Sequence, residues 1–255
     1  MKTKIEIFLN SSEHIFDLSF SDNLMLCNYA RLNSYGFCSM IGGAESIRDL
    51  QESKNIFADA FEFPMIESEF AIKKIFVGLK KVFIDDNYSL IDKKIFINIS
   101  SIDGLALLKG LNNLKIPEFL ERSNIIFNFD RRGITKSLGL AKNDNFELFE
   151  FEKEINTIIK THLTFIKNSS MKFSISGGIT ENSIKCLFEY KLFPDFFKTG
   201  LFTIEVDSLK GNIYENIYEL QCLELKLLNT MNKCIIHKHN YLQIRELHLQ
   251  KYILN

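Results

Sequence analysis

Short apolar runs alternate along this chain with segments whose apolar residues recur at helical spacing. Apolar runs bounded by glycine or polar clusters predict buried strands. They lie at residues 4–9, 36–41, 58–66, 94–99, 125–129, 172–175 and 196–204. Helical spacing follows most of them, at residues 22–32, 45–53, 70–79, 103–108, 146–165 and 180–187. This alternation predicts parallel strands joined by helical crossovers. Asp22 and Asp103 are expected to cap the helices that begin near them.

Seven or eight such strand and helix units, in a chain of 255 residues, fit an α/β (β/α)8 TIM barrel. A doubly wound open sheet is the alternative. Gly42-Gly43 and Gly177-Gly178 each follow a strand, but neither belongs to a GxGxxG or GxxxxGK[ST] motif. We therefore expect a single TIM-barrel domain over residues 1–255, with the barrel over about 4–210. A C-terminal helical region over about 211–255 is expected to pack on the barrel or on a partner subunit.

The composition is that of an ordinary globular protein and narrows the possible partners. The net charge of −1 gives no electrostatic reason to expect a nucleic acid partner. The five cysteines are an odd number without a CxxC pair, which is neither a disulfide framework nor a zinc signature. No apolar run approaches membrane-spanning length. We expect a cytoplasmic protein without a membrane partner.

The segment over residues 124–140 carries the most suggestive chemistry. Its apolar run Ile125–Phe129 breaks into Asp130-Arg131-Arg132-Gly133. Because functional groups in barrel folds lie where strands end, this pattern predicts a core strand that delivers polar groups to a site. A surface turn is the plainer interpretation. Other polar residues fall at or near predicted strand ends, namely Glu45, Glu67, Asn98, Ser100, Lys136 and Lys198.

The strand-end motifs together resemble one protein family. In order, they are MIGGAE at 40–45, FEFPMIES at 61–68, FINISS at 96–101, FNFDRRGITKSLGL at 127–140, SISGGIT at 174–180 and FFKTGLFTI at 196–204. Their order and spacing look like the HpcH/HpaI aldolase and citrate lyase β-subunit family, within the phosphoenolpyruvate/pyruvate-binding barrels. The likeness is greatest to uncharacterised members often found with polysaccharide-biosynthesis genes, and it covers roughly residues 20–250.

The resemblance implies a TIM barrel that cleaves or forms carbon–carbon bonds in 2-oxo or 3-hydroxy acids and thioesters. In such relatives a divalent metal, commonly Mg²⁺, holds the oxo acid and stabilises an enolate. The physical reason is charge, because a hard cation held by two carboxylates neutralises the adjacent negative oxygens of the enolate. An arginine or lysine at the strand mouth adds to this effect.

This sequence departs from the family where the metal is bound. A family pattern like INIET reads Ile97-Asn98-Ile99-Ser100-Ser101 here, so Ser100 replaces the first carboxylate. Alignment on the SLGL motif puts Gly133 where the second carboxylate belongs. Met40 replaces a basic residue, and the FFKTG segment lacks the acidic and basic residues of the family pattern. Since Mg²⁺ prefers carboxylates, we expect the usual metal site to be weak or absent. Asp130 is a possible metal ligand if a bulge shifts the strand end.

Site residues follow from the resemblance and from the strand ends. The catalytic candidates are Arg131, Asp130 and Lys198, and the substrate-binding candidates are Glu45, Glu67, Asn98, Ser100, Gly177 and Gly178. Arg131 matches a family arginine and could bind a carboxylate or phosphate through both nitrogens. Structural ion pairs between Arg131 and Glu67, or between Asp130 and Arg132, are equally compatible with the sequence. Lys198 could form a Schiff base, although a solvated or salt-bridged lysine is the plainer interpretation.

Two functions remain open from the sequence. One is a diverged aldolase or lyase that acts on a small 2-oxo acid or sugar-derived substrate, in keeping with a role in polysaccharide biosynthesis. The other is a non-catalytic pseudoenzyme that binds a ligand or a partner subunit, because the family metal carboxylates are replaced by Ser100 and Gly133. In both cases we expect a small-molecule ligand and a homo-oligomer.

Overall fold

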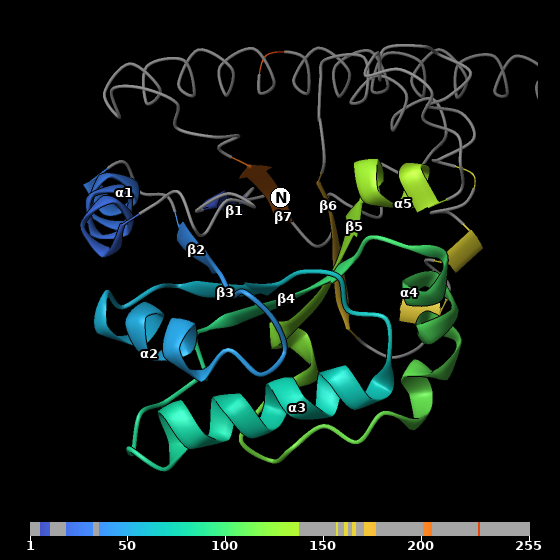
Figure 1. The fold of residues 1–255 in the computed structure, drawn as a ribbon, viewed down its shortest axis with the longest axis horizontal. Coiled ribbons are helices and arrows are strands. Elements are labelled where there is room, and N and C mark those ends of the chain that lie inside the picture. The colour runs from blue at the N-terminus through green and yellow to red at the C-terminus, as the bar shows by residue number, and fades with distance from the viewer. Residues whose placement is uncertain are drawn as a thin grey trace, which may run out of the picture.

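A computed structural model describes residues 6–10, 19–32, 36–137, 171–176 and 201–205, with single helical positions at 157, 161, 162, 165, 166 and 229. Within these residues one parallel sheet forms, in the order β6-β5-β4-β3-β2-β1-β7 (Figure 1). Its strands are β1 Glu6–Asn10, β2 Gly36–Met40, β3 Ala60–Phe63, β4 Lys94–Ile99, β5 Ile125–Asp130, β6 Lys172–Ser176 and β7 Leu201–Glu205. The predicted α/β class with a parallel sheet is confirmed.

Helices connect the strands that follow one another along the chain. They are α1 Phe20–Leu32, α2 Ile47–Asn55, α3 Glu69–Leu79, α4 Ile102–Leu107 and α5 Arg131–Ser137. A π-helical turn at Lys80–Ile84 continues α3, and short 3₁₀ helices lie at Leu108–Asn113 and Arg122–Asn124. The strands at the two ends of the sheet order, β6 and β7, approach each other with Cα atoms within 8 Å, so the sheet is strongly curved.

The two faces of the sheet from β2 to β6 are both buried but differ in chemistry. Most of the described odd-numbered residues of β2 to β6, such as Phe61, Ile97 and Phe127, belong to the large apolar core shared with α2, α3 and α4. Even-numbered residues point to the opposite face, because successive strand side chains alternate. There Cys38, Ala60, Phe96 and Ile126 form a small separate apolar cluster. We call this second face the inner face.

Two helix caps differ from the expected ones. Ser19, not Asp22, precedes α1, and the Ser19 N–H donates to Asp22 Oδ2 at 2.9 Å while Asp22 N–H donates to Ser19 Oγ at 3.2 Å. This reciprocal pair is a capping box, in which Asp22 has the third helical position. Ser101, not Asp103, caps α4, because its hydroxyl accepts the Gly104 N–H at 3.2 Å. In both cases a serine precedes the acidic residue and provides the cap.

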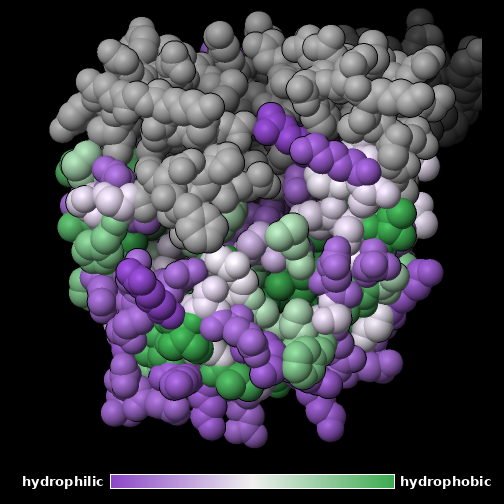
Figure 2. All heavy atoms as spheres, viewed as in Figure 1, coloured by the Kyte–Doolittle hydropathy of each residue, from purple (hydrophilic) through white to green (hydrophobic). Residues whose placement is uncertain are grey.

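Several predicted elements lie wholly or largely outside the described residues. They are the helices over 146–165 and 180–187, residues 196–200 of the seventh strand, and the C-terminal region over about 211–255. Among the described helices, none has the length and apolar character that crossing a membrane requires. Figure 2 shows a mainly hydrophilic surface along the edge where α3 runs, broken by apolar side chains. Phe70 and Val77 of α3 are among the exposed ones.

Candidate functional site

A hydrogen-bonded set of polar side chains lies on the inner face of the sheet, beyond the small apolar cluster. We call this set the polar layer, and its members are Glu62 of β3, Asn98 of β4, Asn128 of β5, and Ser174 and Ser176 of β6. Glu62, Asn128, Ser174 and Ser176 are fully buried, and Asn98 is 4% exposed. Each lies within two residues of the C-terminal end of its strand. The polar layer is therefore at the edge where parallel sheets bind ligands.

Asn128 connects the other members of the polar layer. Its Nδ2 atom lies 3.2 Å from Glu62 Oε1, 2.5 Å from Asn98 Oδ1 and 2.8 Å from Ser176 Oγ. Its Oδ1 atom accepts a hydrogen bond from Ser174 Oγ at 2.6 Å. An amide nitrogen carries two protons, so three acceptors share two donors. The side chains of four strands are thus held together through one amide group.

The C-terminal end of β5 passes directly into α5. Asp130 is the last residue of the strand, and its Oδ1 atom accepts the backbone N–H of Arg132 at 3.1 Å. This is the geometry of a helix N-cap, in which the side chain satisfies the N–H of the second helical residue. The pairing of β5 with β6 runs evenly from Ile126 opposite Lys172 to Asp130 opposite Ser176. The bulge that would shift Asp130 toward the expected metal position is therefore not present between these two strands.

Gly133 is packed tightly between the ends of β4 and β5. A Cβ atom at this position would lie 2.5 Å from Asp130 Oδ2, 2.7 Å from Ser100 Cβ and 2.8 Å from the Ser100 carbonyl oxygen. Contacts below 3 Å require the neighbours to move, and one of these neighbours is backbone. The structure thus brings Ser100, Asp130 and Gly133 together, as the sequence predicted for one site. It leaves no room for a side chain where the family carboxylate is expected.

These residues do not fit a magnesium site of the family type. Mg²⁺ takes carboxylate oxygens in near-octahedral geometry. Here Ser100 offers a neutral hydroxyl, Gly133 offers no side chain, and the Asp130 carboxylate caps a helix. In the part of the chain that the structure describes, no group of three or more histidine, cysteine, aspartate and glutamate side chains could hold a metal ion.

Arg131 is the largest fully buried side chain among the described residues. Glu67 is exposed, and the ion pairs between described residues do not include Arg131 with Glu67. Asp130 and Arg132 are joined by a hydrogen bond from the Arg132 backbone N–H to the Asp130 carboxylate, which is not the side-chain ion pair that the sequence left open. Thr135 Oγ1 donates to the Arg131 carbonyl oxygen one helical turn back. Burial of a guanidinium is costly unless charged or hydrogen-bonding partners meet it.

The remaining sequence candidates lie apart from the polar layer or outside the described residues. Glu45 is exposed, and its carboxylate pairs with Lys74 Nζ of α3 at 2.7 Å. Glu67 lies in the exposed loop before α3. Lys198, Gly177 and Gly178 lie outside the described residues. Of the substrate-binding candidates, Asn98 and Ser100 are thus the ones that the structure places beside Asp130, Asn128 or Gly133.

Sequence reasoning named Asn98 but missed Glu62, Asn128, Ser174 and Ser176. The signal is a polar residue between apolar neighbours in successive strands, in Phe-Glu-Phe, Ile-Asn-Ile, Phe-Asn-Phe and Phe-Ser-Ile. Because successive side chains of a strand alternate between its faces, apolar neighbours that all face the core place the polar residues of these strands on the opposite face.

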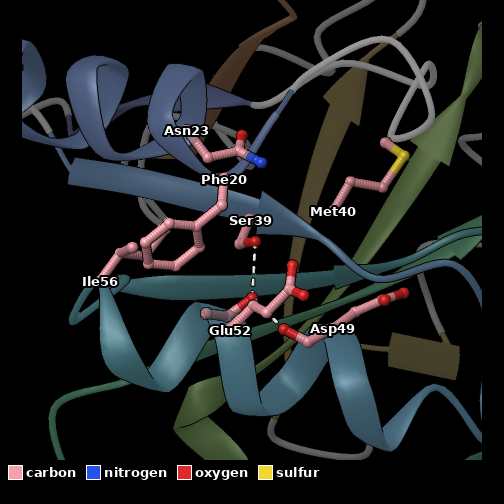
Figure 3. Close-up of a pocket in the computed structure, with 8 residues that line it drawn as sticks. Phe20, Asn23, Ser39, Met40, Asp49, Glu52 and Ile56 are labelled. Atoms are coloured by element: carbon pink, nitrogen blue, oxygen red, sulfur yellow. Dashed lines mark hydrogen bonds between the residues drawn. The ribbon is translucent and has the colours of Figure 1, made fainter.

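A small cavity lies on the other side of the sheet, between α1, β2 and α2 (Figure 3). Its volume of about 20 Å³ suits a single water molecule. Ser39 points from β2 toward α2, where its hydroxyl lies 2.7 Å from Ser53 Oγ. Ser53 Oγ is also 2.7 Å from the Asp49 carbonyl oxygen. The cavity is a packing feature of the helical side and is separate from the polar layer.

Comparisons with known proteins place the fold. No protein-family model matches the sequence, and no curated protein matches it. Solved structures do match, among them an HpcH/HpaI aldolase/citrate lyase family protein from Burkholderia cenocepacia J2315, at 9% identity and a TM-score of 0.55 over 80% of this chain and 88% of that one. Citrate synthase SbnG matches at 10% identity and a TM-score of 0.55, over 91% and 96% of the two chains.

Malate synthase from Haloferax volcanii is also similar, at 7% identity and a TM-score of 0.56 over 86% of this chain and 80% of that one. At sequence identities this low, the structural similarity shows a shared fold alone. Since these matches include the family that the strand-end motifs resemble, the predicted resemblance is confirmed at the level of structure. The chain has the fold of the HpcH/HpaI aldolase/citrate lyase family proteins.

Proposed function

We propose that this chain is a diverged aldolase-type lyase, which cleaves or forms a carbon–carbon bond in a small 2-oxo acid or sugar-derived substrate. The observation that carries the proposal is the polar layer at the C-terminal ends of β3 to β6. It combines a carboxyl group, two amides and two hydroxyls in one buried network. Such groups can move a proton and donate hydrogen bonds to a developing negative oxygen.

The fold supports the same function. Neighbours of similar structure include proteins named as citrate synthase, malate synthase and an aldolase/citrate lyase family member. We propose further that the sheet closes into a (β/α)8 barrel, because its end strands β6 and β7 approach each other. In a closed barrel the inner face becomes the interior, and the polar layer lies below the mouth where substrates bind.

A second candidate function is a non-catalytic barrel that binds a ligand or partner. The observation that favours it is the packing at Gly133, which excludes a side chain from the position of a family metal ligand. The two candidates differ in turnover rather than in binding, because both retain the polar layer.

The deciding experiment follows pyruvate release from oxaloacetate and from a panel of 4-hydroxy-2-oxo acids, with the full chain, in Mg²⁺ and in EDTA. We expect release that EDTA leaves unchanged. Calorimetric titration with Mg²⁺ is run in parallel, and micromolar binding abolished by Asp130→Ala would show a rebuilt metal site. Absence of turnover, of pyruvate or oxaloacetate binding, and of a borohydride-trapped adduct at Lys198 would overturn the lyase and leave the non-catalytic barrel.

A further inference from the structure

Met65 follows β3 in a backbone conformation that a methionine does not favour. Its φ angle of 48° lies in the left-handed region, which glycine and asparagine adopt most readily. The side chain is 71% exposed, so it adds little to the hydrophobic core. Strained residues persist where the surrounding structure fixes them, and they gather at functional sites. The stability of the fold therefore does not explain a methionine at this position.

The backbone on both sides explains the conformation of Met65, but not its side chain. Pro64 follows the end of β3, and the turn after it brings the Ile66 N–H to the Asn98 carbonyl oxygen at 3.0 Å. The Ile66 side chain is buried. Asparagine or glycine at position 65 would allow the same turn at a lower conformational cost. What the methionine adds is an exposed apolar side chain at the C-terminal edge of the sheet.

A second exposed apolar side chain lies beside this loop, at the start of α4. A Cβ atom on Gly104 would lie 3.2 Å from the Ile66 carbonyl oxygen, so the loop after β3 contacts the first turn of α4. Figure 1 shows the two segments side by side. Ile102 is the first residue of α4 and is 48% exposed. Met65 and Ile102 are thus close neighbours of one packed contact between two successive connections.

Two carboxylates accompany these apolar side chains. Glu67 and Asp103 are both exposed, and among the described residues neither takes part in an ion pair. The nearby Glu69, by contrast, pairs with Lys73 at 2.8 Å. The four residues that we call the rim patch are Met65, Glu67, Ile102 and Asp103. The rim patch therefore combines exposed apolar side chains with negative charge that no cation in the described part of the chain balances.

We propose that the rim patch is a docking surface for a basic protein segment, in which an apolar side chain is flanked by lysine or arginine. An unbranched methionine adapts to apolar partners of different shape, and methionine is enriched in protein interfaces. Carboxylates beside an apolar centre attract a cationic partner and discriminate against an acidic one. The same charge disfavours an anionic 2-oxo acid as the occupant. The docking surface does not depend on the lyase function.

The test measures binding of a fluorescent synthetic peptide to the full chain by fluorescence polarisation. The peptide carries leucines at helical spacing and lysines at the other positions, and the control peptide has glutamate in place of lysine. We expect only the lysine peptide to bind, with an affinity that falls as salt is added. Met65→Asn should weaken this binding about tenfold. The double variant Glu67→Gln with Asp103→Asn should weaken it at least as much, because it removes both carboxylates.

Matched substitutions outside the rim patch separate docking from general effects. Val77→Asn removes an exposed apolar side chain of α3, and Glu118→Gln removes an exposed carboxylate. Both variants should bind the lysine peptide like the wild type. Since asparagine tolerates the left-handed conformation, Met65→Asn should be at least as stable as the wild type in urea unfolding. Weaker binding by this variant then reports the lost side chain rather than a lost fold.

Three outcomes would overturn the proposal. They are no binding of the lysine peptide, equal binding of the two peptides, and binding that Met65→Asn and the double variant leave unchanged. Sedimentation velocity of the chain without peptide tests a different occupant. Self-association that Met65→Asn abolishes would show that a second copy of this chain covers the rim patch, and would overturn the basic partner. Pyruvate release is measured separately, so none of these outcomes decides the lyase function.

Discussion

The carboxylate of Asp130 occupies the space that a side chain on Gly133 would need. Its Oδ2 atom lies 2.5 Å from the position of a Cβ atom on Gly133. The same carboxylate caps α5 through its Oδ1 atom. Gly133 is therefore required for α5 to begin directly at the end of β5. The residue that the family alignment places at a metal position is here a requirement of the local packing.

Replacement of Gly133 by alanine should destabilise the protein. The added Cβ atom would clash with Asp130 Oδ2 and with the Ser100 carbonyl oxygen, and such overpacking costs about 1–3 kcal/mol. Urea unfolding measures the loss. Gly110→Ala is the control, because nothing lies within 4 Å of a Cβ atom there, and equal stability of the two variants would contradict the packing argument.

Asn128→Ala should lower stability more than any substitution of an exposed asparagine. It removes the group that bonds to Glu62, Asn98, Ser174 and Ser176. Each buried polar partner left unsatisfied costs about 1–3 kcal/mol. Asn112→Ala, at an exposed position, should change stability by less than about 0.5 kcal/mol. A small effect of Asn128→Ala in urea unfolding would mean that water replaces the amide.

Lys93 should make stability depend on pH in the alkaline range. Burial lowers the pKa of its ammonium below the ordinary value of 10.5, and its Nζ atom donates to the Ala58 carbonyl oxygen at 2.7 Å. Between the lowered pKa and 10.5 the unfolded chain binds more protons, so stability rises with pH across this window. The free energy of unfolding of the wild type, minus that of Lys93→Met, should therefore increase as pH rises toward 10.5. A difference that stays flat would contradict the lowered pKa.

Cys27 should make stability fall as pH rises in the alkaline range, which is the opposite of the effect of Lys93. Burial raises the pKa of its thiol above the ordinary value of 9.0, and its Sγ atom lies 3.3 Å from the Ile56 carbonyl oxygen. Above pH 9.0 the folded state keeps a proton that the unfolded chain loses, so this contribution disappears as pH rises through the folded pKa. The difference between wild type and Cys27→Ala should fall above pH 9.0. Alkylation of Cys27 by iodoacetamide, mapped by mass spectrometry, should be fast only after unfolding.

Lys54 should contribute more to stability than Lys74, although both form ion pairs. Lys54 Nζ donates to the Val82 carbonyl oxygen at 2.8 Å and to Asp86 Oδ2 at 2.6 Å, and its side chain is only 13% exposed. Lys54→Met should cost about 1–3 kcal/mol. The Lys74 pair with Glu45 is exposed on both sides, so Lys74→Met should cost less than about 1 kcal/mol. Similar melting temperatures for the two variants would contradict this ranking.

The strands could be predicted from the sequence because each one is formed by a short, continuous run of mainly apolar residues. The run Lys94–Ile99 is a strand over the predicted residues, and Ile125–Phe129 is one residue short of the observed strand. The predicted run over 58–66 is too long, since β3 ends at Phe63. Pro64 follows directly, and its ring removes the N–H that a continued ladder would need.

The site could be predicted only in part, because its contacts depend on which strands lie side by side. Asn98, Ser100 and Asp130 were found from their places near the strand ends, and Gly133 was found from the alignment on the SLGL motif. The role of Asp130 as a cap was not predicted, since it requires α5 to start without a loop. Glu62 was not found either, because its hydrogen-bond partner Asn128 lies two strands away. Local sequence patterns do not determine the register between strands, so they cannot predict this contact.

The alternation on β3, β4 and β5 also limits how the chain can misfold. A shift of one residue in any of these strands exchanges its two faces. Glu62, Asn98 or Asn128 would then enter the apolar core beneath α2, α3 and α4, without the amide and hydroxyl groups that now meet them. Each misaligned strand would bury an unsatisfied polar group, at about 1–3 kcal/mol or more. The polar layer therefore discriminates against wrong strand registers, whatever molecule it binds.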